Sequence, residues 1–202
     1  ITVETSGAFV QKSASGIIEN YGQMQVTKTT SVLETIHDYT YWSSPVNSPL
    51  VGEALANANA NRRYWFDARN YLDEHGELNN DNSTSHPPDD VDDDGNAWTL
   101  SSPNDTMING FGYAATHSTE AYSGIGQYSY SFLGTFNTGT INVDVYRNDQ
   151  STEDNNWNLL GNPYPSAINI QKFFYENAYA LNPTSGALEG VLYLWSQSTP
   201  PS

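Results

Sequence analysis

Hydrophobic and polar residues alternate over short stretches, which predicts strands rather than long helices along most of the chain. These stretches are rich in Tyr, Trp, Val and Thr, which favour strands, and Gly, Asn and Pro residues separate them. The predicted strands cover residues 39–42, 63–66, 111–116, 127–135, 140–147, 157–160 and 191–195. Many short strands with such turns predict an all-β fold, a β-sandwich or jelly-roll-like domain.

The remaining segments complete the predicted organisation. Residues 52–60 (GEALANANA) can form one or two helical turns, and Ser166 is placed to cap a short helix at 168–177. Residues 67–110 are polar and predict a long loop. Short Gly- and Asn-separated units near the start predict a β-solenoid-like or hairpin segment at 1–30, the end of an upstream region. The rest is then a β-sandwich-like module at 31–202, truncated at its C-terminus.

Charge and composition narrow the classes of partner. Seven Lys and Arg residues stand against 23 Asp and Glu residues, a formal net charge of −16. Because phosphate binding needs a basic surface, we expect no nucleic-acid partner. No apolar run approaches the roughly 20 residues of a membrane span, so we expect no membrane insertion. The chain has no Cys, so stability outside the cell would come from packing or from a metal rather than from disulfides.

An acidic stretch within the long polar segment has the pattern of a cation-binding loop. Asp90, Asp92 and Asp94 alternate, and Gly95 and Asn96 follow. This spacing lets three carboxylates and one amide oxygen converge on a hard cation, and Ca²⁺ accepts such a loose set of oxygen ligands. We therefore predict a structural calcium site at these aspartates and Asn96. A solvated acidic loop without metal is the alternative interpretation.

The pattern departs from a full EF-hand loop. The position that would carry the bidentate Glu is Ser101, so a further ligand must come from elsewhere. Other oxygen-bearing residues that can supply it are Asp67, Asp73, Asn79, Asn80 and Asp81.

The sequence contains no catalytic motif that we can identify. The four histidines lack metal-ligand spacing, and no HExxH, GxSxG, Walker or GxGxxG motif occurs. A glycosidase would need two carboxylates on opposed strands, and the sequence does not pair its acidic residues. We therefore assign no catalytic residue and do not expect an enzyme.

Aromatic residues offer a second kind of chemistry. Five Trp and 14 Tyr residues can form a stacking platform for sugar. The alternative is that Trp42, Trp65, Trp157 and Trp195, which lie in predicted strands, belong to the core.

Four phrases in this order resemble a module of large secreted proteins of Bacteroidota that are exported by the type IX system. They are residues 39–46 (YTYWSSPV), 111–117 (FGYAATH), 132–139 (FLGTFNTG) and 157–168 (WNLLGNPYPSAI). The resemblance implies display on the outer cell surface or release, and it transfers no catalytic residues. Asp105-Thr106-Met107 also resembles the O-glycosylation site of exported Bacteroidota proteins, with Thr106 as acceptor.

The resulting expectation is a non-catalytic, extracellular structural or adhesive β-domain stabilised by Ca²⁺. Its partners would be neighbouring domains, copies of the same protein or surface glycans. The alternative is a carbohydrate-binding module attached to a secreted degradative enzyme.

Overall fold

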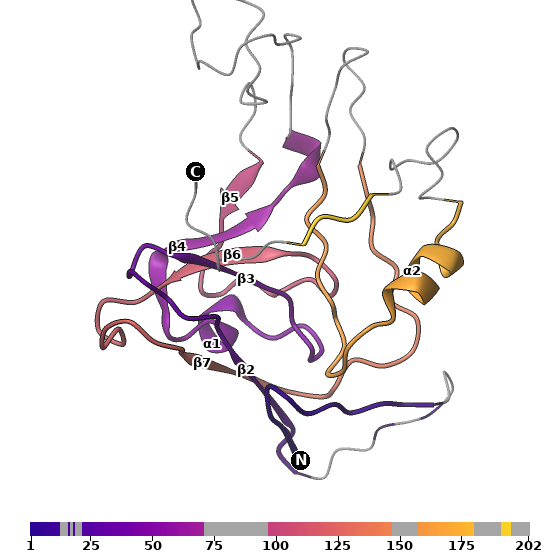
Figure 1. Cartoon of the computed structure of the whole chain (residues 1–202), viewed down its shortest axis with the longest axis horizontal. Coiled ribbons are helices and arrows are strands. Elements are labelled where there is room, and N and C mark those ends of the chain that lie inside the picture. The colour runs from indigo at the N-terminus through magenta and orange to yellow at the C-terminus, as the bar shows by residue number, and fades with distance from the viewer. Residues whose placement is uncertain are drawn as a thin grey trace, which may run out of the picture.

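The chain forms two β-sheets with few and short helices, as the computed structural model shows (Figure 1). The structure describes residues 1–12, 16, 18, 22–70, 97–146, 157–179 and 191–194. One sheet has three strands in the order β1-β2-β7, and the other has four in the order β3-β6-β4-β5. The predicted all-β class is therefore confirmed.

The three-stranded sheet joins the start of the chain to its middle. Strand β1 (Thr2–Val3) runs parallel to β2 (Gln25–Thr29), and β2 pairs antiparallel with β7 (Ser129–Leu133). In β7, Tyr130 and Phe132 are buried and alternate with exposed residues, as period-2 patterning requires. Strands β1 and β2 thus share a sheet and a core with the later part of the chain.

The four-stranded sheet is centred on β6 (Tyr113–His117), whose residues are all buried. Strand β3 (Tyr39–Trp42) pairs with one edge of β6 and β4 (Ala58–Phe66) with the other. Strand β5 (Trp98–Leu100) pairs with the end of β4. All these pairings are antiparallel. Strand β5 lies within the segment predicted to be a loop, so that prediction is wrong at its C-terminal end.

The helices are short and differ in part from the prediction. Helix α1 spans Val51–Ala54, η1 is a 3₁₀ turn at Ala68–Asn70, and α2 spans Ile170–Glu176. The helical prediction for 52–60 is wrong after residue 54, because residues 58–60 already belong to β4. Pairing in a sheet with buried Ala58 outweighs the helix propensity of alanine there.

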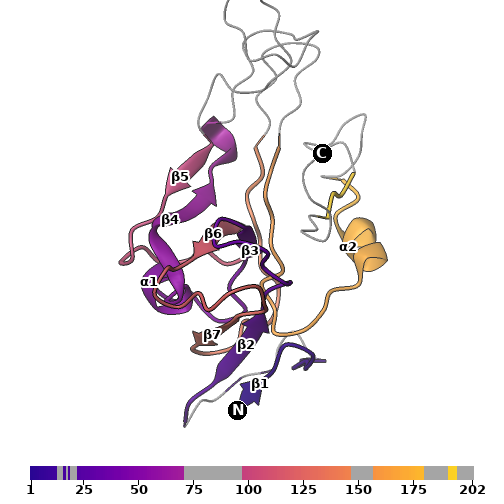
Figure 2. The same ribbon diagram turned by 60° about the vertical axis from the view of Figure 1, so that its left-hand side comes forward.

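Helix α2 begins two residues later than predicted, and its cap lies three residues later. Its N-cap is Asn169, whose side-chain oxygen accepts a hydrogen bond from the Lys172 amide at 2.9 Å, so Ser166 is not the cap. Helix α2 buries no residue, and Figure 2 shows it standing apart from both sheets.

Three other predicted strands are not regular strands. Residues 140–146 and 191–194 have no strand assignment, and residues 157–160 contribute only an isolated bridge between Leu160 and Phe111. The segment at 140–146 has a different partner. The side-chain oxygen of Asn158 accepts a hydrogen bond from the Tyr146 amide, and its side-chain nitrogen donates one to the Tyr146 carbonyl, both at 2.9 Å. A side chain here replaces a partner strand, and propensity alone does not predict that.

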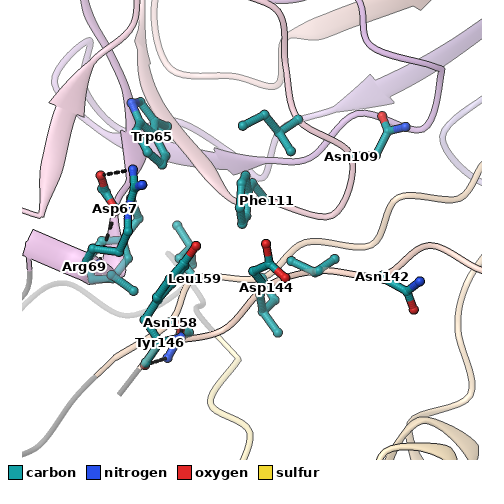
Figure 3. Close-up of a pocket in the computed structure, with 15 residues that line it drawn as sticks. Trp65, Asp67, Arg69, Asn109, Phe111, Asn142, Asp144, Tyr146, Asn158 and Leu159 are labelled. Atoms are coloured by element: carbon teal, nitrogen blue, oxygen red, sulfur yellow. Dashed lines mark hydrogen bonds and ion pairs between the residues drawn. The ribbon is translucent and has the colours of Figure 1, made fainter. Parts of the chain in front are cut away.

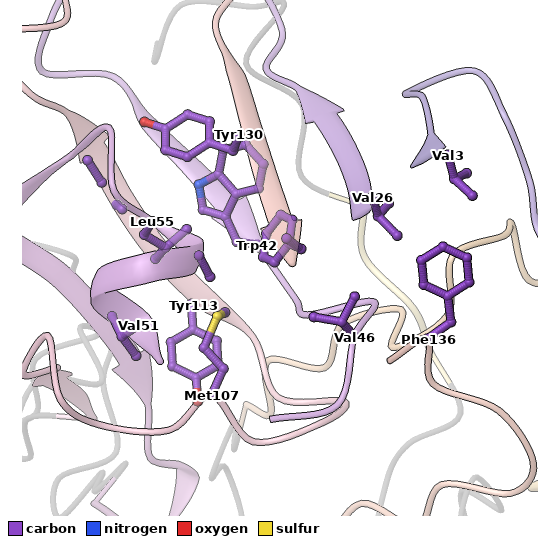
Figure 4. Packing of buried hydrophobic residues seen from close by; sticks show 14 of the residues in the cluster. Val3, Val26, Trp42, Val46, Val51, Leu55, Met107, Tyr113, Tyr130 and Phe136 are labelled. Atoms are coloured by element: carbon purple, nitrogen blue, oxygen red, sulfur yellow. The ribbon is translucent and has the colours of Figure 1, made fainter. Parts of the chain in front are cut away.

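The core lies between the two sheets (Figure 4). Trp42 of β3 contacts Tyr130 of β7 with ring centroids 4.4 Å apart, which joins the sheets directly. Val46, Leu55 and Met107 are fully buried beside them. Burying an aromatic side chain removes about 150–250 Å² from water, so a few such residues account for much of the stabilisation.

A buried polar cluster lies within this core. His117 of β6 and Tyr130 are linked by a 2.6 Å contact between Nδ1 and the phenol oxygen. Arg63 is also buried and donates to the carbonyl of Ala58 at 2.8 Å. Burial lowers the pKa of His117 and of Arg63 and raises the pKa of Tyr130. The imidazole is therefore held neutral by its surroundings.

No helix in the part of the chain that the structure describes has the length and apolarity needed to cross a membrane.

Candidate functional site

A pocket of 310 Å³ lies beside the end of β4, at the lower end of the size range of small-molecule sites (Figure 3). Four segments of the chain line it. Strand β4 and η1 contribute residues 65–69, the turn before β6 contributes residues around 108–111, and the extended segments at 142–146 and 158–160 form the opposite wall.

Aromatic rings form the apolar part of the pocket. Trp65 and Phe111 lie with ring centroids 6.1 Å apart, and Tyr146 faces them from the opposite wall (Figure 3). Trp65 and Phe111 are only partly buried although they pack against the core cluster, so each has one side in the core and one in the pocket. Asn158 fixes the backbone of Tyr146, and this places its ring.

A cation bridges the two aromatic walls. The guanidinium carbon of Arg69 lies 6.0 Å from the Trp65 ring centroid and 5.7 Å from that of Tyr146, within cation–π range. Asp67 holds the guanidinium by two hydrogen bonds of 2.7 Å, from Nε to Oδ1 and from Nη2 to Oδ2. Such paired bonds fix the orientation of an arginine.

The environment of Asp67 keeps this pair ionised. Its side chain is 8 % exposed, and the hydrogen bonds from Arg69 lower its pKa below the ordinary value. The same bonds raise the pKa of Arg69. A carboxylate held in this way cannot act as a general acid near neutral pH.

Polar side chains line the rest of the pocket. Asp144 is exposed, and its carboxylate points toward the space below Phe111 (Figure 3). Asn142 and Asn109 lie farther along the same pocket. The pocket therefore combines apolar faces with hydrogen-bonding groups at their edge.

The acidic stretch predicted to bind calcium is not part of this pocket. Asp90, Asp92, Asp94 and Asn96 lie outside the described residues, so the calcium site stays a prediction. Asp67, a candidate for the further ligand, has both carboxylate oxygens bonded to Arg69. Within the described ranges, no group of three or more His, Cys, Asp or Glu side chains is placed to hold a metal ion.

The predicted glycosylation acceptor is accessible. Thr106 is exposed, and it forms an isolated antiparallel bridge with Leu50, whereas the neighbouring Met107 is fully buried. Its modification stays a prediction.

The tryptophans divide between core and surface. Trp42 is 7 % exposed and belongs to the core, as expected. Trp157 is 43 % exposed and contacts Tyr193, so the alternative interpretation that places it in the core is wrong. Trp65 packs against the core and also lines the pocket. Trp195 lies outside the described residues.

Comparison with known protein families assigns the chain to one of them. The model of a family described as "Domain of unknown function (DUF8693)" matches residues 1–202, the whole chain. The chain belongs to the DUF8693 family. No curated protein and no solved structure matches it.

Sequence reasoning missed most of the pocket of this DUF8693 domain. Arg69, Phe111 and Tyr146 had no predicted role, and Asp144 was only one of several unpaired carboxylates. One local signal exists, since the oppositely charged Asp67 and Arg69 stand two residues apart directly after a strand that ends in aromatic residues. Tyr146 carries no such signal, because Asn158 positions it from 12 residues away.

Proposed function

We propose that this chain is a non-catalytic, extracellular adhesive β-domain that binds carbohydrate in the pocket between Trp65, Phe111 and Tyr146. The observation that carries the proposal is the combination of aromatic faces with a carboxylate and amides at their edge. A pyranose ring has apolar C–H faces and a rim of hydroxyls, so it matches both parts. Small-molecule sites typically pair such apolar walls with a few polar groups.

A binding role fits the pocket better than a hydrolytic one. Glycoside hydrolysis needs two carboxyl groups, one of them protonated as a general acid. Among the residues that line the pocket, Asp67 is held ionised by Arg69, and Asp144 is the second carboxyl group. Asp67 therefore cannot serve as the proton donor, and both of its oxygens are already bonded to Arg69.

The location and the calcium ion are further parts of the proposal. The phrases at 39–46 and 157–168 support membership in a module of secreted Bacteroidota proteins exported by the type IX system. The alternating aspartates at 90–94 support a structural Ca²⁺ ion. Neighbouring domains and copies of the same protein are proposed partners alongside surface glycans.

The proposed carbohydrate binding is tested on a glycan array, followed by calorimetric titration of the glycans that bind. Tyr146→Ala should weaken binding about five- to thirtyfold, because one ring contact contributes about 1–2 kcal/mol. Trp157→Ala is the matched control, since it removes an exposed aromatic ring outside the pocket. Equal loss in both variants, or no glycan bound by the wild type, would contradict the proposal.

A further inference from the structure

The charges of the side chains that line the pocket do not sum to zero. Of the 15 residues that line it, only Asp67, Arg69 and Asp144 are charged. Asp67 and Arg69 form an ion pair with an N–O distance of 2.7 Å and together carry no net charge. Asp144 is left as one negative charge.

The arginine in the pocket is not arranged as an anion receptor. Two of its hydrogen bonds go to Asp67, and its guanidinium is held between the rings of Trp65 and Tyr146. Asp67 already neutralises this cation, so an acidic ligand that approached Arg69 would also meet the carboxylate beside it.

Asp144 differs from Asp67 in its exposure and in its hydrogen bonding. It is exposed, and no hydrogen bond or ion pair joins its carboxylate to another residue in the described part of the chain. Figure 3 shows it directed into the pocket opposite Phe111. An ionised carboxylate only accepts hydrogen bonds, so its natural partners are donors such as neighbouring sugar hydroxyls.

We propose that the pocket selects uncharged sugars with neighbouring hydroxyls and rejects acidic sugars, and that Asp144 is the residue that determines this specificity. The inference rests on the proposed function and adds the class of sugar. A sugar carboxylate about 6 Å from Asp144 would weaken binding on the order of tenfold, at an effective dielectric between those of bulk water and a protein surface. The chain's net charge of −16 adds repulsion of the same sign.

Matched pairs of oligosaccharides test the inference. Oligomers of glucose and glucuronate, of galactose and galacturonate, and of mannose and mannuronate, each pair with the same linkage, are titrated calorimetrically into the whole chain. We expect at least one neutral oligomer to bind, and its acidic counterpart to bind about tenfold more weakly at 20 mM salt. This difference should shrink to about threefold or less at 1 M salt, where the charges are screened.

Two variants separate the local charge from the overall charge. Asp144→Asn keeps the shape of the side chain and should reduce the difference to about threefold or less at low salt. Glu120→Gln removes the same charge from an exposed residue outside the pocket and should leave the tenfold difference unchanged.

The possible failures are distinguishable. Acidic oligomers that bind the wild type as well as their neutral counterparts, through a site that Tyr146→Ala weakens, would overturn the selectivity and leave the proposed function standing. A tenfold difference that persists in Asp144→Asn would overturn the role of Asp144. No binding by any of the six oligomers would overturn the proposed function and this inference together.

Discussion

The side-chain amide of Asn137 joins its own loop to two others that are far away in the chain, one at Ser44 and Val46 and one at Pro163. Its Nδ2 lies 3.1 Å from the carbonyl oxygen of Ser44, 3.2 Å from that of Val46 and 2.9 Å from that of Pro163. The side chain is buried, as are all three of these partners. Replacing Asn137 with Ala should therefore destabilise the whole domain.

The size of the effect follows from what each carbonyl loses. The amide has two hydrogens, which the three contacts share. Val46 keeps a second donor, because the Ser44 hydroxyl lies 2.7 Å from its carbonyl oxygen. The carbonyl groups of Ser44 and Pro163 lose their side-chain donor, and each buried group left unsatisfied costs about 1–3 kcal/mol. We expect a loss of about 3 kcal/mol, which lowers Tm by about 6–12 °C in a domain of this size.

The loss of stability is measured by urea and thermal unfolding of the wild type, Asn137→Ala and Asn137→Asp. Asn137→Asp keeps the shape but places acceptors against the three carbonyl oxygens, so it should be less stable than Asn137→Ala. Asn104→Ala, at an exposed asparagine, is the control and should change stability by less than about 0.5 kcal/mol. The reasoning is refuted if Asn137→Ala loses less than about 1 kcal/mol, or if Asn137→Asp is as stable as the wild type.

Three further predictions concern stability. Gly161→Ala should cost about 1–3 kcal/mol in urea unfolding, because the added Cβ would lie 2.1 Å from the Ser43 Cβ, and a second change of Ser43→Gly should recover part of the loss. The buried, neutral His117 has a lowered pKa, so stability should be complete above pH 6.5 and fall below it by at most about 1.4 kcal/mol per pH unit. His117→Gln should flatten this dependence, and an unchanged slope would count against the imidazole as its source. If the aspartates at 90–94 bind calcium tightly, EDTA should remove about 3–4 kcal/mol that calcium restores and magnesium does not, and an unchanged melting curve would argue for a solvated loop.

The local pattern was sufficient for the strands that pair over most of their length. Strands β3 and β7 and helix α2 lie within their predicted ranges. The prediction failed where a partner decides the conformation, as for β5, which exists as a strand through its pairing with Phe66 and its neighbours in β4. It also failed at Tyr146, where the side chain of Asn158 takes the place of a strand.

The motif at 157–168 shows how a local signal acquires a tertiary reason. Its glycine, asparagine and prolines predict a turn by themselves. Only the structure shows that Gly161 is packed against Ser43 and that the carbonyl of Pro163 accepts from Asn137. The turn is therefore a contact point between distant loops as well as a reversal of the chain.

By itself, the sequence determined the all-β class, the turn residues, the acidic charge and the supply of aromatic side chains. These properties depend on residue type and on short-range periodicity, so they can be read along the chain. Only the tertiary structure decided that Trp42 is buried, that Trp157 is exposed, and that Trp65 shares a pocket with Tyr146. The distance between these residues depends on the order of the strands in the sheets and on side chains such as Asn158. Pairing between distant segments cannot be predicted from the alternation of residues within a single strand.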